Sequence, residues 1–338
     1  ALAAITSAFC LPGVPPKDEI RSQSHPYVLM ALATGSFLTL YALRSGTYDF
    51  YSNYIFICII LLLGLTSLYY FIRSMINSDE EQPLMSMKPI FKSKRYRSGV
   101  MVFFTSYLIM GSNSYFIPQV LQKGLGFGWE TVGNWYSLGL SSMVVGLWVH
   151  LKIFPRRPNG KKYFMLSFFC IALYGFLMSR VSSTTDMQGY ILPSLLMYGI
   201  FIVFLQITAA SKTFTELEHN PAVFSHAQQF KNMISQIGQS MGVALASIGL
   251  QWRTTVHYNV LNNNVTDGNA IFHATLTQVA AQYAKHTDIV TANKMAFSWI
   301  QSLVKQQSIL WAGVDYFTLI FVIGIIGFFV MFFQKRLN

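Results

Sequence analysis

Long apolar runs, separated by short polar segments, make up most of this chain. A run of roughly 20 apolar residues can cross a bilayer as a helix, and runs this uniform do not show the alternation of a membrane β-barrel. The pattern predicts eight spans, at residues 27–43, 54–72, 98–121, 132–150, 163–180, 189–211, 226–250 and 314–334. We therefore expect an all-α integral membrane protein, a polytopic bundle of about eight transmembrane helices.

The polar segments divide these spans into a two-helix unit and a six-helix unit. The stretch "ALAAITSAFCLP" resembles the end of a membrane helix, and a cleaved signal peptide is the alternative. The mixed charges of "NSDEEQP" and "KSKRYR" are typical of a solvated connector. The expected units are 1–26 (remnant of a preceding span and linker), 27–72 (transmembrane hairpin), 73–97 (cytoplasmic linker), 98–334 (six-helix bundle with external loop 251–312) and 335–338 (cytoplasmic tail).

Composition and charge support a membrane location. Only 11% of residues are charged, whereas about 25% is usual for soluble domains. Alternating topology places 16 Lys and Arg residues on the side that carries loops 73–97 and 150–162, and 7 on the other side. By the positive-inside rule these two loops are cytoplasmic. The net charge of +11 thus reflects topology, and we expect no nucleic-acid partner.

The predicted helix around residues 226–250 combines a small-residue face with an amide stripe. Gly238, Gly242 and Ala246 recur every four residues, a spacing that lets a neighbouring membrane helix approach closely. An amide stripe inside a bilayer must face protein or water. Two interpretations stay open, a water-filled cavity and interhelical hydrogen bonding. The stripe consists of Gln229, Asn232, Gln236 and Gln239.

Other spans also carry polar side chains, which together indicate a lined pathway for a substrate or for protons. Asp315, in "ILWAGVDYFTLIF", is the acidic residue at the predicted mouth of the last span. It could cap that helix, or it could stand at the outer entrance of the pathway. The candidate pathway residues are Asn113, Tyr115, Gln119, Asn134, Gln206, Asn232, Gln236 and Asp315.

The sequence carries no pattern of an enzyme. It lacks the G-x-S-x-G, H-E-x-x-H, phosphate-loop and dinucleotide motifs, and its three cysteines are dispersed. We expect no catalytic residue, no metal and no cofactor. A channel is disfavoured because no filter-like loop or ring of acids occurs.

Three stretches resemble one transporter family. "FIPQVLQKGLGFGWETVG" (116–133), the preceding "KPIFKSKRYRSG" and the helix "QFKNMISQIGQSMGVAL" resemble the fourteen-span multidrug:proton antiporters of the major facilitator superfamily, the EmrB/QacA type. The resemblance implies that 98–334 is the C-terminal half of that fold and that 27–72 is the extra helix pair. It also places Arg156, Arg157, Lys161 and Lys162 in the cytoplasmic gating loop, here without the family's acidic residue.

The family's activity implies a secondary active transporter of the inner membrane that exports drug-like or amphipathic compounds in exchange for protons, by alternating access. The implied partners are a small-molecule substrate, protons, the lipid bilayer, the missing N-terminal half and a periplasmic adaptor protein. The fragment alone is expected to be inactive. A nutrient or siderophore-type facilitator is the alternative within the class. A membrane-bound enzyme or a non-transporting scaffold is the alternative outside it.

Overall fold

The computed structural model describes residues 26–78, 85–156, 158–266 and 268–335, so the expected remnant at 1–26 lies outside it except for its last residue. Throughout this part of the chain the regular structure is helical, without strands. The helices are α2 (Pro26–Asn77), α3 (Met87–Lys92), α4 (Lys94–Gln119), α5 (Trp129–Leu140), α6 (Ser142–Ile153), α7 (Gly160–Met178), α8 (Leu192–Thr213), α9 (Pro221–Asn262), α10 (Ala270–Tyr283) and α11 (Ile289–Phe333), with π-helical turns at Val120–Gly124 and Met187–Ile191.

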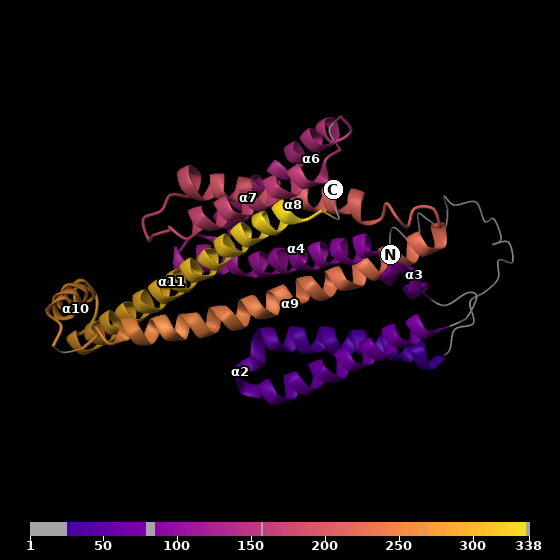
Figure 1. Cartoon of the computed structure of the whole chain (residues 1–338). Coiled ribbons are helices and arrows are strands. Elements are labelled where there is room, and N and C mark those ends of the chain that lie inside the picture. The colour runs from indigo at the N-terminus through magenta and orange to yellow at the C-terminus, as the bar shows by residue number, and fades with distance from the viewer. Residues whose placement is uncertain (1–25, 79–84, 157, 267, 336–338) are drawn as a thin grey trace, which may run out of the picture.

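Seven helical segments of the described chain are long and apolar enough to cross a membrane, which confirms the predicted fold class. One of them, α2, folds back on itself near Asp49 and Asn53, whose backbone angles leave the helical range. Its two legs match the predicted spans 27–43 and 54–72 (Figure 1). The eight predicted spans therefore correspond to seven helical segments, one of which is a hairpin.

The hairpin α2 is held together by close backbone contact and lies along α9 (Figure 1). A Cβ atom at Gly64 would lie 2.7 Å from the backbone nitrogen of Thr39 in the other leg. Ser247 in α9 donates a hydrogen bond to the Thr47 carbonyl oxygen at 2.6 Å. The hydroxyl of Tyr51 donates to the Ile248 carbonyl oxygen at 3.1 Å. The hairpin is thus joined to the bundle through polar contacts near its bend.

Helices α4, α7, α8, α9 and α11 pack around one hydrophobic core that is rich in aromatic rings. Helix α4 lies between α8 and α9, while α7 packs against both α8 and α11. At the centre, Tyr174 of α7 is fully buried, stacks on Tyr198 of α8 and meets the ring of Phe317 of α11 edge-on. Because these rings come from three helices, they fix how α7, α8 and α11 lie relative to one another.

The turn after α4 follows from its sequence. Pro118 lies in the last turn of α4, and the chain continues into the π-helical turn Val120–Gly124. Gly126 has a φ of +78°, a backbone conformation that residues other than glycine rarely adopt. The Pro-to-Gly stretch that suggested the family therefore forms the sharp exit from this helix.

The segment 251–312, expected to be an external loop, is largely helical. Helix α9 continues to Asn262, and α11 already begins at Ile289, so the last span does not start at residue 314. On α11, Ala292, Ala296 and Ile300 are buried at four-residue spacing. A helix outside the bilayer needs only one apolar face, so a search for uniformly apolar runs misses this extension.

The linker 73–97, expected to be cytoplasmic, is not a purely solvated connector. Its residues 79–84 lie outside the described chain, but Met87 and Ile90 of α3 are fully buried. Tyr96 at the start of α4 is also buried and donates a hydrogen bond to the Ala227 carbonyl oxygen at 2.6 Å. These apolar residues are interleaved with the charged ones, so one side of the linker packs on the bundle.

Candidate functional site

A cavity of about 430 Å³ opens between α4, α8 and the start of α9. Its wall combines aromatic rings, amides and one charge of each sign, from Lys231 and Glu218. The lining includes Phe103, Gln206, Phe214, Glu218, Gln228 and Lys231. An apolar wall with a few polar groups is the usual composition of a small-molecule site.

Gln206 of α8 lines this cavity and connects α8 to α4. Its side-chain nitrogen donates a hydrogen bond to Ser106 Oγ in α4 at 2.8 Å and lies 3.5 Å from the sulfur of Met110. On the α9 side, the Lys231 ammonium lies 5.0 Å from the ring centre of Phe103, a cation–π contact. Gln206 thus bridges α4 and α8 and also lines the cavity.

The amide stripe of α9 lies next to the residues of that helix that line the cavity, Gln228 and Lys231. Asn232 and Gln236 are exposed in the described part of the chain. An exposed amide at membrane depth is unfavourable against lipid, so this face requires water or further protein. Neither residue lines the cavity between α4, α8 and α9, and both interpretations of the stripe stay open.

Asn113 has a different environment. Its side chain is fully buried and accepts a hydrogen bond from the Tyr174 hydroxyl at 2.7 Å. The next residue on α4 towards the N-terminus, Ser112, is hydrogen-bonded to the Tyr316 hydroxyl at 2.8 Å. The Tyr316 ring stacks on Phe116 with ring centres 3.8 Å apart. Asn113 therefore joins α4 to α7 inside the core and does not line the cavity between α4, α8 and α9.

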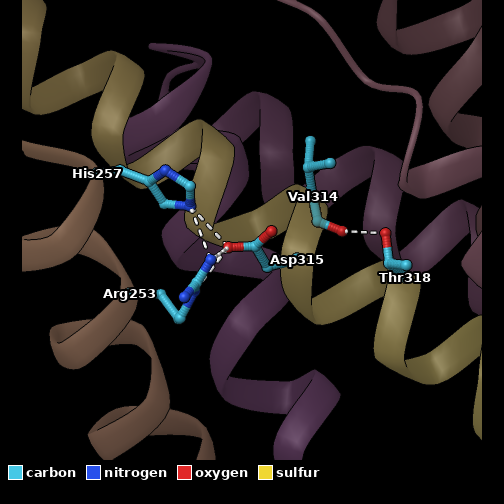
Figure 2. A network of polar contacts seen from close by, with 5 residues as sticks. All are labelled: Arg253, His257, Val314, Asp315 and Thr318. Atoms are coloured by element: carbon cyan, nitrogen blue, oxygen red, sulfur yellow. Dashed lines mark hydrogen bonds and ion pairs between the residues drawn. The ribbon is translucent and has the colours of Figure 1, made fainter. Parts of the chain in front are cut away.

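Asp315 lies at the centre of a polar network between α9 and α11 (Figure 2). Arg253 donates through Nε to Asp315 Oδ2 at 2.7 Å, and its Nη2 lies 2.7 Å from the same oxygen. His257 Nε2 is 2.6 Å from that oxygen. About one third of each of the Asp315 and Arg253 side chains is exposed. The guanidinium of Arg253 and the imidazole of His257, both from α9, thus contact the same carboxylate of α11.

The helix-cap interpretation of Asp315 is wrong. The residue lies well inside α11, which begins at Ile289 and is capped by Asp288, whose carboxylate accepts from the Thr291 backbone N–H at 3.2 Å. Hydrogen bonds from the side chain and the backbone N–H of Thr291 lower the pKa of Asp288, the residue just before α11. Asp315 instead pairs two helices at the level where they leave the apolar core.

The other candidate pathway residues do not meet at one point. The Tyr115 hydroxyl accepts a hydrogen bond from Ser247 in α9 at 3.0 Å, close to the α2 hairpin. Gln119 is half-buried at the end of α4, and Asn134 is exposed on α5. Neither of these two residues lines the cavity between α4, α8 and α9.

The small-residue face of α9 lies directly on α4. A Cβ atom at Gly242 would lie 2.2 Å from the Leu108 carbonyl oxygen, and one at Gly238 would lie 3.0 Å from that of Phe104. Ala246 is buried on the same side. These positions leave no room for a larger side chain.

The basic loop after α6 is described except for Arg157. Arg156 and Lys162 are exposed, and the Lys161 ammonium lies 4.7 Å from the ring centre of Phe332 in α11. Lys212 at the end of α8 donates a hydrogen bond to the Pro158 carbonyl oxygen at 2.7 Å. The loop is thus in contact with both α8 and α11.

Sequence reasoning missed Arg253, His257 and Tyr174. The first two are four residues apart, on one face of α9, just beyond the predicted end of its span. A longer helix in the prediction would have placed them near Asp315. Tyr174 gives no such signal, because a tyrosine in an apolar run can equally face lipid or core. Among the described residues, no cluster of His, Cys, Asp and Glu could hold a metal ion.

Comparison with known proteins supports the family resemblance. No protein-family model matches this chain. It is 23% identical over 212 residues to the probable multidrug resistance protein EmrY of Escherichia coli (strain K12), which covers 61% of this chain and 39% of that protein. It is 23% identical over 266 residues to the colistin resistance protein EmrB of Acinetobacter baumannii, which covers 76% of this chain and 49% of that protein.

These matches confirm a distant similarity to the EmrB/EmrY multidrug transporters of the major facilitator superfamily. The chain spans about half the length of these relatives or less. Both relatives are named as resistance proteins and not as enzymes. At the family level the similarity supports membrane transport.

Proposed function

We propose that this chain forms the C-terminal part of a transporter that exports amphipathic, drug-like compounds across the inner membrane in exchange for protons. The observation that carries the proposal is the cavity between α4, α8 and α9, bordered by exposed amides of α9, in a chain distantly similar to multidrug transporters. Alternating access would expose this cavity to each side of the membrane in turn.

The chemistry of the cavity suits amphipathic compounds. Phe103 and Phe214 offer flat apolar surfaces, while Gln206 and Gln228 offer hydrogen bonds without a fixed charge. Such a wall binds compounds of different shapes, because stacking and amide contacts depend little on a single geometry. The name of one relative refers to colistin resistance, which agrees with export of a toxic compound.

The uncovered amide face supports a second part of the transporter. Asn232 and Gln236 would be unfavourable against lipid, so we infer that the N-terminal half of the transporter faces them across a water-filled space. This places the substrate pathway between the two halves. On this proposal, a chain that spans only part of its relatives would be inactive alone.

Proton exchange is assigned to Asp315 and His257. A carboxylate and an imidazole 2.6 Å apart can exchange a proton with water, and both side chains are partly exposed. Arg253 shares the same carboxylate oxygen, so protonation of Asp315 would weaken the contact between α9 and α11. A change in this contact is one way to couple a proton to helix movement.

Two further assignments follow from the same proposal, a gating loop and one partner. The basic loop with Arg156, Lys161 and Lys162 would face the cytoplasm and act as the gating loop. The outer ends of α9 and α11, together with α10, extend beyond the predicted spans and would meet a periplasmic adaptor protein.

The test is export by the full-length protein in membrane vesicles. An imposed proton gradient should drive efflux of a fluorescent amphipathic dye, and collapse of the gradient should stop it. Gln236→Leu should change the range or rate of compounds exported at normal membrane levels. The matched control is Asn259→Leu, an exposed amide of the same helix beyond the predicted span, which should not.

Absence of gradient-driven flux for every compound of a chemically diverse panel would contradict the proposed activity. If Gln236→Leu only lowers the amount of protein in the membrane, the amide stripe serves folding and its place in the substrate pathway fails.

A further inference from the structure

A second cavity of about 670 Å³ forms a groove between α4 and α11, at the end of the bundle where α11 ends. Its floor is the ring of Phe168 from α7, and its sides are aliphatic. The lining of the groove includes Arg97, Met101, Thr105, Ile323, Val330 and Gln334. The groove is independent of the cavity used for the proposed function, because Met101 and Phe103 lie on opposite sides of α4.

The groove has the length of one membrane leaflet. Its lining on α4 runs from Arg97 to Thr105, a rise of about 12 Å, and on α11 from Ile323 to Gln334, about 16 Å. Half of the hydrocarbon core of a bilayer is about 15 Å thick. The groove therefore reaches from the polar boundary of the bundle to roughly the middle of the bilayer.

The polar groups of the groove are gathered at its mouth. Arg97, Ser98 and Gln334 line the end next to the basic loops, whereas Met101, Val330 and their neighbours line the depth. Arg97 is exposed, and no ion pair joins it to an acidic side chain in residues 26–78, 85–156, 158–266 and 268–335. A cation at the mouth of an apolar groove matches a molecule with an anionic head and a hydrocarbon tail.

We propose that this groove binds an anionic phospholipid from the leaflet next to the basic loops, with the phosphate at Arg97 and one acyl chain between α4 and α11. An apolar peptide helix would fill the depth of the groove but would leave Arg97 without an anion. A zwitterionic lipid would fill the depth with less attraction at the mouth. The combination of an aliphatic channel with one cationic end selects the anionic lipid.

The experiment uses the full-length protein in lipid nanodiscs of phosphatidylcholine with a small fraction of photoactivatable phosphatidylglycerol. After illumination, crosslinked peptides are mapped and counted. We expect labels on residues 97–105 and 323–334, reduced by added phosphatidylglycerol but not by added phosphatidylcholine. Arg97→Gln should lower labelling about fivefold, which corresponds to the roughly 1 kcal/mol that one basic residue contributes to binding an anionic surface.

Two variants separate the charge from the shape of the groove. Arg97→Lys keeps the charge and should retain most of the labelling, while Met101→Trp fills the groove and should remove it. Arg180→Gln removes an exposed arginine just after α7, remote from the groove, and should leave labelling unchanged. This control shows that any loss is not a general effect of lowering positive charge.

Several results would overturn the proposal. Equal competition by phosphatidylcholine would make the groove an unselective lipid contact. Unchanged labelling in Arg97→Gln would remove the assigned headgroup site. Displacement of the label by an exported dye and not by lipid would identify a substrate entrance. None of these results depends on whether transport is observed.

Discussion

Replacing Gly242 with alanine should push α4 away from α9. The new Cβ atom would lie 2.2 Å from the Leu108 carbonyl oxygen and 2.9 Å from the Ser112 backbone nitrogen. Carbon and oxygen ordinarily approach to about 3.3 Å, so the two backbones would have to separate by about 1 Å. Overpacking of this kind costs about 1–3 kcal/mol.

The assay is thermal unfolding of the detergent-solubilised protein at one fixed heating rate, since membrane proteins often unfold irreversibly. A loss of 1–3 kcal/mol should lower the apparent Tm by about 2–6 °C. The matched control is Gly249→Ala in the same helix, where an added Cβ atom meets nothing within 4 Å. This control should leave the apparent Tm unchanged or raise it slightly, because alanine favours the helix.

Equal apparent Tm values for the two alanine variants would refute the reasoning. Such a result would mean that α4 and α9 can separate at no cost, so the small-residue face would not determine how the two helices pack. A fall in both variants would point to a general intolerance of α9 to substitution and would equally remove the special role of Gly242.

Three further predictions concern polar residues. Asp315→Asn should abolish proton-dependent export yet change stability by less than about 1 kcal/mol, because its pair with Arg253 is partly exposed; unchanged pH dependence of dye efflux would contradict this. Tyr174→Phe leaves the buried Asn113 oxygen without its donor and should cost about 1 kcal/mol in thermal stability, and an unchanged Tm would show that water replaces the hydroxyl. In a cysteine-free background, an impermeant thiol reagent added outside should label Asn263→Cys but not Asn159→Cys, and the reverse pattern would invert the topology.

The span pattern was predictable because the bilayer imposes it. Each leg of α2 and each membrane-spanning segment from α4 to α9, with α5 and α6 counted as one, must present an apolar surface over about 20 residues, and this requirement is local in sequence. The projecting part of α11 was not predictable in the same way. Outside the bilayer only a stripe such as Ala292, Ala296 and Ile300 is apolar, and such a stripe is weak within a polar segment.

The candidate site was predictable only in its residue types. The sequence shows that Asn113, Gln206 and Gln236 are unusual inside spans, but not which of them are paired. That depends on helix rotation, which the packing of distant segments decides. Tyr174 lies 61 residues from Asn113 in the sequence and donates a hydrogen bond to its side-chain oxygen. In the described chain, Gln236 is exposed.

The length of α11 has a mechanical consequence. Ile289 and Asp315 lie on one uninterrupted helix, and 26 residues of helix rise about 39 Å. A tilt of about 10° around Asp315 would therefore displace the outer end by roughly 7 Å. Since α10 packs on α11, it would move with this end (Figure 1). On the proposed role of Asp315, a rigid helix of this length would convert a small rearrangement at this carboxylate into a large displacement of its N-terminal end.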